Sequence, residues 1–193
     1  MELRRGFKTE TNDIAREIRQ ELTLKSAAPL DPWGLAAHLA IPVLPLTDLE
    51  EIPDAVGHFT RAEPSAFSAV TVFLGTRRII VYNDRHSRTR QAADIAHELA
   101  HALLGHPPST ALDERGCRYW NPEMEEEAKW LSGALLVSEE AALGVVLQGK
   151  SLADAAADYG VSQALMRWRL NVTGALKRIA RVKRVRFAPR RLP

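Results

Sequence analysis

The clearest helical pattern of apolar and polar positions lies in the segment 88–106. Apolar residues recur there at the three- and four-residue spacing of a single helix face: Ile95, Leu99, Ala102 and Leu103. Ser87 is a suitable N-cap, and Gly105 with the two prolines that follow it favours helix termination. The pattern therefore predicts one amphipathic helix that begins at about residue 88.

Two segments before this helix have the composition of β-strands. Residues 67–74 and 78–82 are rich in β-branched and aromatic side chains, and a short glycine-containing turn between them suits a hairpin. Residues 41–45 form a shorter extended segment, whose two prolines confine it to a sheet edge. Residues 53–66 are interpreted as an irregular loop or a weak strand.

The rest of the chain is predominantly helical by its periodicity and its capping residues. The expected helices cover residues 11–23, 31–39, 121–136, 138–149, 151–159 and 162–170. We therefore predict an α+β fold, in which a small, mostly antiparallel sheet packs on helices and a helix-turn-helix-like part follows. The expected organisation is a first domain over 1–137, a helical domain over 138–176 and a basic tail over 177–193, with residues 1–10 as a loosely held basic arm.

Composition excludes several classes of protein. Of the 193 residues, 46% are hydrophobic, which is ordinary for a globular chain. A single cysteine allows no internal disulfide and fits a reducing compartment. No apolar run approaches the length of a membrane span, and the charged start lacks the features of a signal peptide. These features predict a cytoplasmic protein with no membrane partner.

Charge is distributed unevenly along the chain. Residues 1–158 carry 16 basic and 24 acidic side chains, whereas residues 159–193 carry 10 basic and no acidic ones. A basic C-terminal region of this kind can bind nucleic acid, an acidic partner or the acidic body of its own chain.

The candidate chemistry lies in the predicted helix, at His97-Glu98-Leu-Ala-His101. Residues four apart on a helix share a face, so both imidazoles can reach one Zn²⁺ ion. Glu98 lies beside that face, where a general base can take a proton from water. A His-Glu-x-x-His pattern on an amphipathic helix therefore predicts a zinc site with His97 and His101 as ligands and Glu98 as the catalytic base.

The third zinc ligand has to come from elsewhere. A downstream histidine in the spacing His-Glu-x-x-His-x-x-Gly-x-x-His is absent, and we interpret His106 as a helix-end residue that favours the C-terminal dipole. The acids at 123, 125 and 126 are interpreted as first-turn residues of the helix that begins after Asn121. Glu127 differs, because it shares a helix face with Leu131 and Ala134, towards the core. We therefore predict Glu127 as the third ligand.

These motifs resemble those of the ImmA/IrrE family of metallo-endopeptidases. The similarity covers roughly residues 10–175 and rests on the His-Glu-Leu-Ala-His motif together with Glu127-Ala-Lys-Trp-Leu-Ser132. In the family a Glu-Ala-Asn-x-Phe-Ala-like helix carries the third ligand, and Lys129, Leu131 and Ser132 depart from that pattern. The resemblance implies a zinc endopeptidase whose substrate is a helix-turn-helix repressor, cleaved to relieve repression of stress or mobile-element genes.

Other residues receive more limited roles. Tyr119 and Arg118 are candidates for stabilising the oxyanion, against a plain surface role. Cys117 could bind the metal, although a partly exposed thiol with no functional role is the simpler interpretation. The remaining histidines, at 38, 58 and 86, are interpreted as structural because they have no partner spacing.

The predicted helices over 151–170 resemble a helix-turn-helix. The second of them carries Gln163, Arg167 and Arg169, which could contact DNA, but the first carries Asp154 and Asp158, which would repel phosphates. We favour a supporting or partner-docking role over DNA binding for this part. The alternative to an endopeptidase is a non-catalytic zinc-containing regulator that binds DNA or a repressor.

Overall fold

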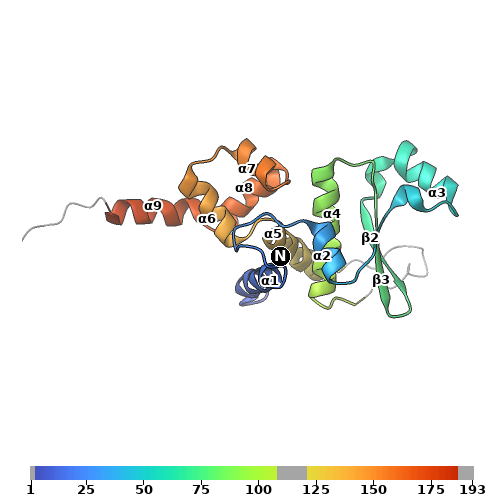
Figure 1. The fold of residues 1–193 in the computed structure, drawn as a ribbon, viewed down its shortest axis with the longest axis horizontal. Helices are drawn as coiled ribbons and strands as arrows, with labels where there is room; N and C mark the ends of the chain where they lie inside the picture. Colours follow the sequence, from blue (N-terminus) through green and yellow to red (C-terminus); the bar gives the residue numbers. More distant parts are fainter. Residues whose placement is uncertain (1–2, 108–120, 187–193) are drawn as a thin grey trace, which may run out of the picture.

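The computed structural model describes residues 3–107 and 121–186, and within these ranges the chain has the predicted α+β fold (Figure 1). The longer helices are α1 (Phe7–Glu21), α4 (Arg88–Leu103), α5 (Pro122–Leu136), α6 (Glu139–Gln148), α8 (Gln163–Val172) and α9 (Ala175–Arg186). The shorter helices are α2 (Pro32–His38), α3 (Pro53–Gly57) and α7 (Leu152–Asp158). The strands are β1 (Val43–Pro45), β2 (Ala69–Leu74) and β3 (Arg77–Tyr82).

The three strands form one mixed sheet in the order β1-β3-β2. β2 and β3 pair as the expected antiparallel hairpin, with Thr71 opposite Ile80, whereas β1 pairs parallel to β3. The short β1 lies at one edge, as its prolines require. β2 forms the other edge and runs past α4 (Figure 1).

The segment between β1 and β2 differs from the prediction of a loop or weak strand. It contains the helical turns α3, His58–Ala62 and Pro64–Ala66. Asn83, which is 1% exposed, donates from its side-chain amide to the carbonyls of Phe59, Pro64 and Phe67. The two turns after α3 are therefore held by one distant buried amide, which local periodicity could not indicate.

The N-terminal helix begins earlier than predicted. α1 starts at Phe7 rather than near Thr11, and the Phe7 side chain is fully buried. Gly6, at φ +87°, directs the chain into this helix in a conformation that favours glycine. The expected loose arm over residues 1–10 was wrong from Phe7 onward, because one buried aromatic side chain anchors the segment.

Capping residues define most of the other helix starts, as the sequence predicts. Asp31 accepts from two backbone amides at the start of α2, and Asn121 does the same at the start of α5. Ser138, Ser151 and Ser162 each accept one backbone hydrogen bond, at α6, α7 and α8. Ser87 occupies the N-cap position of α4, but its side chain makes no capping bond.

α5 is the central helix of the fold. It packs against α4 on one side and α1 on another, and its C-terminal part contacts α8 (Figure 1). One buried cluster joins α1, α2, α4, α5 and β3, while a second joins the end of α5 to α6, α7 and α8. Because α5 is covered on several sides, a polar residue on it can be buried without facing α4.

The C-terminal helices include one element, α9, that the sequence pattern does not predict. α7 and α8 pack together across a turn at Gly160, as expected for a helix-turn-helix-like pair. The predicted basic tail, however, is helical up to Arg186, because Ala175 and Ile179 of α9 are buried in contact with α6 and α8. α9 projects to one end of the molecule (Figure 1).

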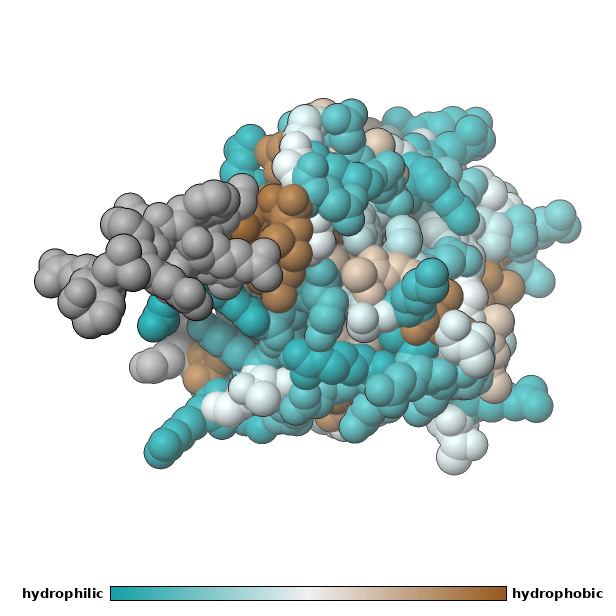
Figure 2. Space-filling model, turned by 60° about the vertical axis from the view of Figure 1, so that its left-hand side comes forward, coloured by the Kyte–Doolittle hydropathy of each residue, from teal (hydrophilic) through white to brown (hydrophobic). Residues whose placement is uncertain are grey.

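The surface of the described residues is largely hydrophilic in Figure 2, with separate hydrophobic areas. No single helix in the described ranges is long and apolar enough to cross a membrane. α5 and α6 meet the length and composition criteria only as a pair, bent by 50°, and most residues of α5 are buried within the fold.

Candidate metal centre

α4 places the two histidines of the motif side by side, as predicted. The Nε2 atoms of His97 and His101 are 3.1 Å apart, and the two rings meet edge to face. Both side chains are partly buried, whereas Leu99 between them is fully buried in the core. The packed side of α4 therefore orients both imidazoles towards one point.

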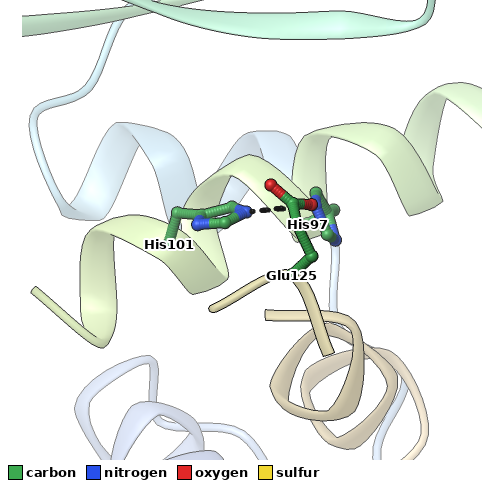
Figure 3. Close-up of side chains that lie close together, drawn as sticks. All are labelled: His97, His101 and Glu125. Carbon is green, nitrogen blue, oxygen red and sulfur yellow. Dashed lines mark hydrogen bonds and ion pairs between the residues drawn. The ribbon is translucent and has the colours of Figure 1, made fainter. Parts of the chain in front are cut away.

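A carboxylate from α5 completes the group. Glu125 Oε2 lies 3.1 Å from His97 Nε2 and 3.7 Å from His101 Nε2 (Figure 3). One ligand atom from each of the three residues lies within 4.8 Å of the others. Asn121 fixes the first turn of α5 by capping it, so that Glu125 projects towards α4 one turn later.

The structure differs from the prediction of Glu127 as the third residue of this group. Glu127 lies two positions further along α5, about 200° around the helix from Glu125. Its carboxylate faces Arg4 and His106 instead, at 3.1 Å and 3.2 Å. The helix has two partly buried faces because it packs against both α1 and α4, and the pattern of apolar residues did not distinguish them.

The three donors match the requirements of a tetrahedral zinc ion. With ligand bonds of about 2.0–2.1 Å, neighbouring donor atoms in a tetrahedron lie about 3.3 Å apart. The three separations in the structure are 3.1, 3.1 and 3.7 Å. Two imidazoles and one carboxylate are also the ligand set that leaves a fourth position for water or substrate in catalytic zinc sites.

The pKa of Glu125 reflects its position between the two rings. Burial raises the pKa, but the adjacent His101 and His97 rings outweigh burial and lower it to about 2. The carboxylate is therefore available as an anionic ligand across the physiological range.

Glu98, the predicted base, lies on the side of α4 that faces the sheet. Its Oε2 atom accepts a hydrogen bond of 2.6 Å from the Thr71 hydroxyl of β2. Thr71 was not predicted as a site residue. The available signal was a polar residue on the inward-facing side of an alternating strand, whose outward side carries the exposed Val72 and Leu74.

His106 was expected as a cationic helix-end residue, and the structure corrects this. Its ring is 8% exposed and lies against His101, with the two Nδ1 atoms 2.9 Å apart. Burial lowers the pKa of His106, partly opposed by its hydrogen bond to Glu127. The buried ring is therefore favoured in the neutral form rather than as a partner of the helix dipole.

The remaining candidates have varied outcomes. Cys117, Arg118 and Tyr119 lie outside the described residues. His38 pairs with Glu21, and the ring of His86 contacts the Pro64 carbonyl and Asp94. His58 lies 3.9 Å from Glu63. Among the described residues, none of these three histidines belongs to the group of candidate metal donors.

One of the three side chains that could contact DNA is buried in the structure. Arg169 is 1% exposed and donates through Nε to the Val137 carbonyl, so it cannot reach a nucleic acid. Burial lowers its pKa to about 10. Gln163 and Arg167 are exposed on α8, as expected.

Two histidines four apart on one helix, a carboxylate from the facing helix and a further acid beside an edge strand define a site of the metallopeptidase type. A comparison with protein families agrees: the model described as Peptidase_M78, IrrE N-terminal-like domain, matches residues 50–171. The chain belongs to this peptidase family, whose members are typically metal-dependent. No match was found among curated proteins or among solved structures.

Proposed function

We propose that the protein is a zinc-dependent endopeptidase, with His97, His101 and Glu125 as the metal ligands. The observation that carries the proposal is the convergence of three donor atoms within 4.8 Å, on the helix that also bears Glu98. A purely structural zinc site would usually be closed by a fourth protein ligand. Within the residues that the structure describes, the group has three protein donors and an acid held nearby, which favours catalysis.

Zn²⁺ bound to these residues would supply Lewis acidity and lower the pKa of water. Glu98 acts as the general base: it takes a proton from the attacking water and gives it to the leaving amine. Its hydrogen bond to Thr71 fixes one carboxylate oxygen and leaves the other for this transfer. Thr71 and the packing of α4 thus keep the base in one orientation throughout the reaction.

The substrate is expected to bind along β2. Within the described residues this strand pairs with β3 alone, so its other edge can pair with an extended peptide. The hydrogen bond between Thr71 and Glu98 brings β2 directly beside the proposed base. A peptide added to this edge would therefore have its backbone next to the reacting groups.

The endopeptidase proposal is tested with a quenched-fluorescence peptide library and the full chain loaded with Zn²⁺. We expect cleavage by the wild type, and its loss in Glu98→Gln although that variant still binds one Zn²⁺ per chain. Cleavage by Glu98→Gln at the wild-type rate would overturn the assigned mechanism. A wild type that binds Zn²⁺ but cleaves no peptide would favour the non-catalytic regulator.

We further propose that the natural substrate is a helix-turn-helix repressor. The support is the resemblance to the ImmA/IrrE family, whose family model matches residues 50–171. The test is incubation of the Zn²⁺-loaded chain with a panel of purified helix-turn-helix repressors, followed by mass spectrometry of the products. Cleavage of unrelated folded proteins at equal rates would contradict this choice of substrate.

A further inference from the structure

A continuous series of side-chain contacts links the N-terminal segment to the metal centre. Arg4 Nε donates to Glu127 Oε1 at 3.1 Å, and the other oxygen of Glu127 lies 3.2 Å from His106 Nε2. The Nδ1 atom of His106 lies 2.9 Å from Nδ1 of His101, whose Nε2 atom faces His97. In both His106 and His101, the two ring nitrogens therefore face two different neighbouring side chains.

The end of α4 brings the two rings together. The amide of His106 donates to the His101 carbonyl and the amide of Gly105 donates to Ala102, with Gly105 at φ +67°. This is the Schellman arrangement, in which the residue after the left-handed glycine returns over the last turn of the helix. His106 is therefore placed against His101 by local backbone geometry, in the position where a hydrophobic contact is usual.

The hydrogen-bond inventory determines which nitrogen carries each proton. An ionised carboxylate accepts hydrogen bonds and cannot donate, so His106 must carry its proton on Nε2 to bond to Glu127. A neutral ring protonated there has an acceptor at Nδ1, and His101 must then donate from its own Nδ1. The Nε2 lone pair of His101 is left free to bind a metal.

We propose that His106 and Glu127 are positioning residues that fix the tautomer and orientation of His101 as a metal ligand. This inference rests on the metal site of the proposed function. It gives a role to His106 and Glu127, which take no part in the proposed catalytic chemistry. Metal-binding histidines commonly donate their second N–H to an acceptor, and such partners influence metal affinity strongly. In this chain the acceptor is a second histidine, held in turn by a carboxylate.

The test measures Zn²⁺ affinity by chelator competition in the full chain, with imidazole tautomers read by long-range ¹H–¹⁵N NMR. Glu127→Gln removes the charge that selects the tautomer of His106. His106→Leu removes the ring that connects Glu127 to His101. Both should weaken Zn²⁺ binding by about 10- to 100-fold. His106→Gln keeps a donor and an acceptor and should recover part of that loss. Glu123→Gln, an exposed carboxylate on the same helix, should leave the affinity within about twofold.

NMR of the Zn²⁺-loaded wild type should show protons on Nδ1 of His101 and Nε2 of His106. The opposite tautomer of either ring, or unchanged affinity in both Glu127→Gln and His106→Leu, would overturn the inference. Equal and complete loss of Zn²⁺ in Glu127→Gln and Glu125→Gln would also overturn it, because Glu127 would then be a ligand. Thermal unfolding of each metal-free variant identifies loss of the fold.

The two proposals can fail separately. A wild type that binds no Zn²⁺ would overturn the metal site, and the tautomer of His106 would still be read in the metal-free chain. If that ring lacked a proton on Nε2, the inference would fall as well. Normal Zn²⁺ binding with no effect of the variants would overturn the positioning role alone.

Discussion

The Thr71 hydroxyl donates a 2.6 Å hydrogen bond to Oε2 of Glu98, which joins the edge strand of the sheet to the helix that carries His97 and His101. The two residues are 27 positions apart in the sequence. A hydrogen bond to a charged group is stronger than one between neutral groups, so this contact limits the rotation of the Glu98 carboxylate.

Thr71→Val should therefore reduce the turnover number of the Zn²⁺-loaded protein. The variant keeps the shape of the side chain but removes its donor, so Glu98 is no longer held in one orientation. We expect a fall in kcat of about tenfold, with Zn²⁺ affinity unchanged, in steady-state peptide cleavage. Thr71→Ser retains the hydroxyl and should keep most of the activity. Equal loss in both variants would point to packing of the strand rather than to the hydrogen bond.

Much of the fold could be predicted because its signals are local. The capping residues Asp31 and Asn121 define helix starts, and the hairpin follows from two β-rich segments around a turn. The turns between α3 and β2 could not be predicted, because they depend on the buried amide of Asn83. α9 was missed for a related reason: its charged sequence conceals the two buried contacts of Ala175 and Ile179.

The candidate site was predictable where helix geometry alone determines it. His97, Glu98 and His101 follow from spacing within one helix. The choice between Glu125 and Glu127 depends on how α5 rotates between α1 and α4, which is a property of the assembled core. His106 was misinterpreted because its burial comes from the turn at Gly105 together with packing by Glu127, and burial reverses the preference for a cation.

Gly133 on α5 is expected to be sensitive to a single added methyl group. A Cβ atom there would clash with Cζ3 of Trp168, a rigid ring that packs edge-on against Trp130. Gly133→Ala should lower the free energy of unfolding by about 1–2 kcal/mol, because overpacking outweighs the better helix propensity of alanine. Gly144→Ala is the matched control, since its Cβ meets nothing closer than 3.7 Å. Urea unfolding should show that this control is neutral or stabilising.

Arg19 stabilises the end of the central helix from a distance. It is 1% exposed and donates to the carbonyls of Ala15 and Leu135, the latter in the last turn of α5. Arg19→Met should cost about 2–4 kcal/mol of unfolding free energy, because a buried carbonyl at a helix end would lose its donor. Arg5→Met, at an exposed position, should change stability by less than about 0.5 kcal/mol. An equal effect of the two variants in chemical denaturation would contradict this role for Arg19.

Asp94 and His86 form a partly buried pair, and neither of the two facing atoms has a hydrogen-bond partner within the described residues. His86 Nε2 contacts the Pro64 carbonyl and therefore carries the proton, which leaves Nδ1 as an acceptor that faces Asp94 Oδ2 at 3.6 Å. Burial raises the pKa of Asp94, and Arg90 and His86 offset this only in part. The ionised carboxylate thus makes the folded state less stable than a neutral side chain would.

Asp94→Asn should therefore stabilise the metal-free protein at neutral pH, by about 1 kcal/mol, since the amide can donate to His86. The raised pKa means that the folded chain holds this proton more tightly than the unfolded chain. The contribution of Asp94 to the stability of the wild type thus falls as the pH rises through the interval above the ordinary aspartate value of about 4. The difference in stability between Asp94→Asn and the wild type should be largest at pH 7. It should shrink as the pH falls towards about 4, where Asp94 becomes protonated. Thermal unfolding across this pH range measures the difference, and Asp13→Asn, at an exposed position, is the control. If Asp94→Asn were less stable than the wild type at pH 7, the charge itself would be required.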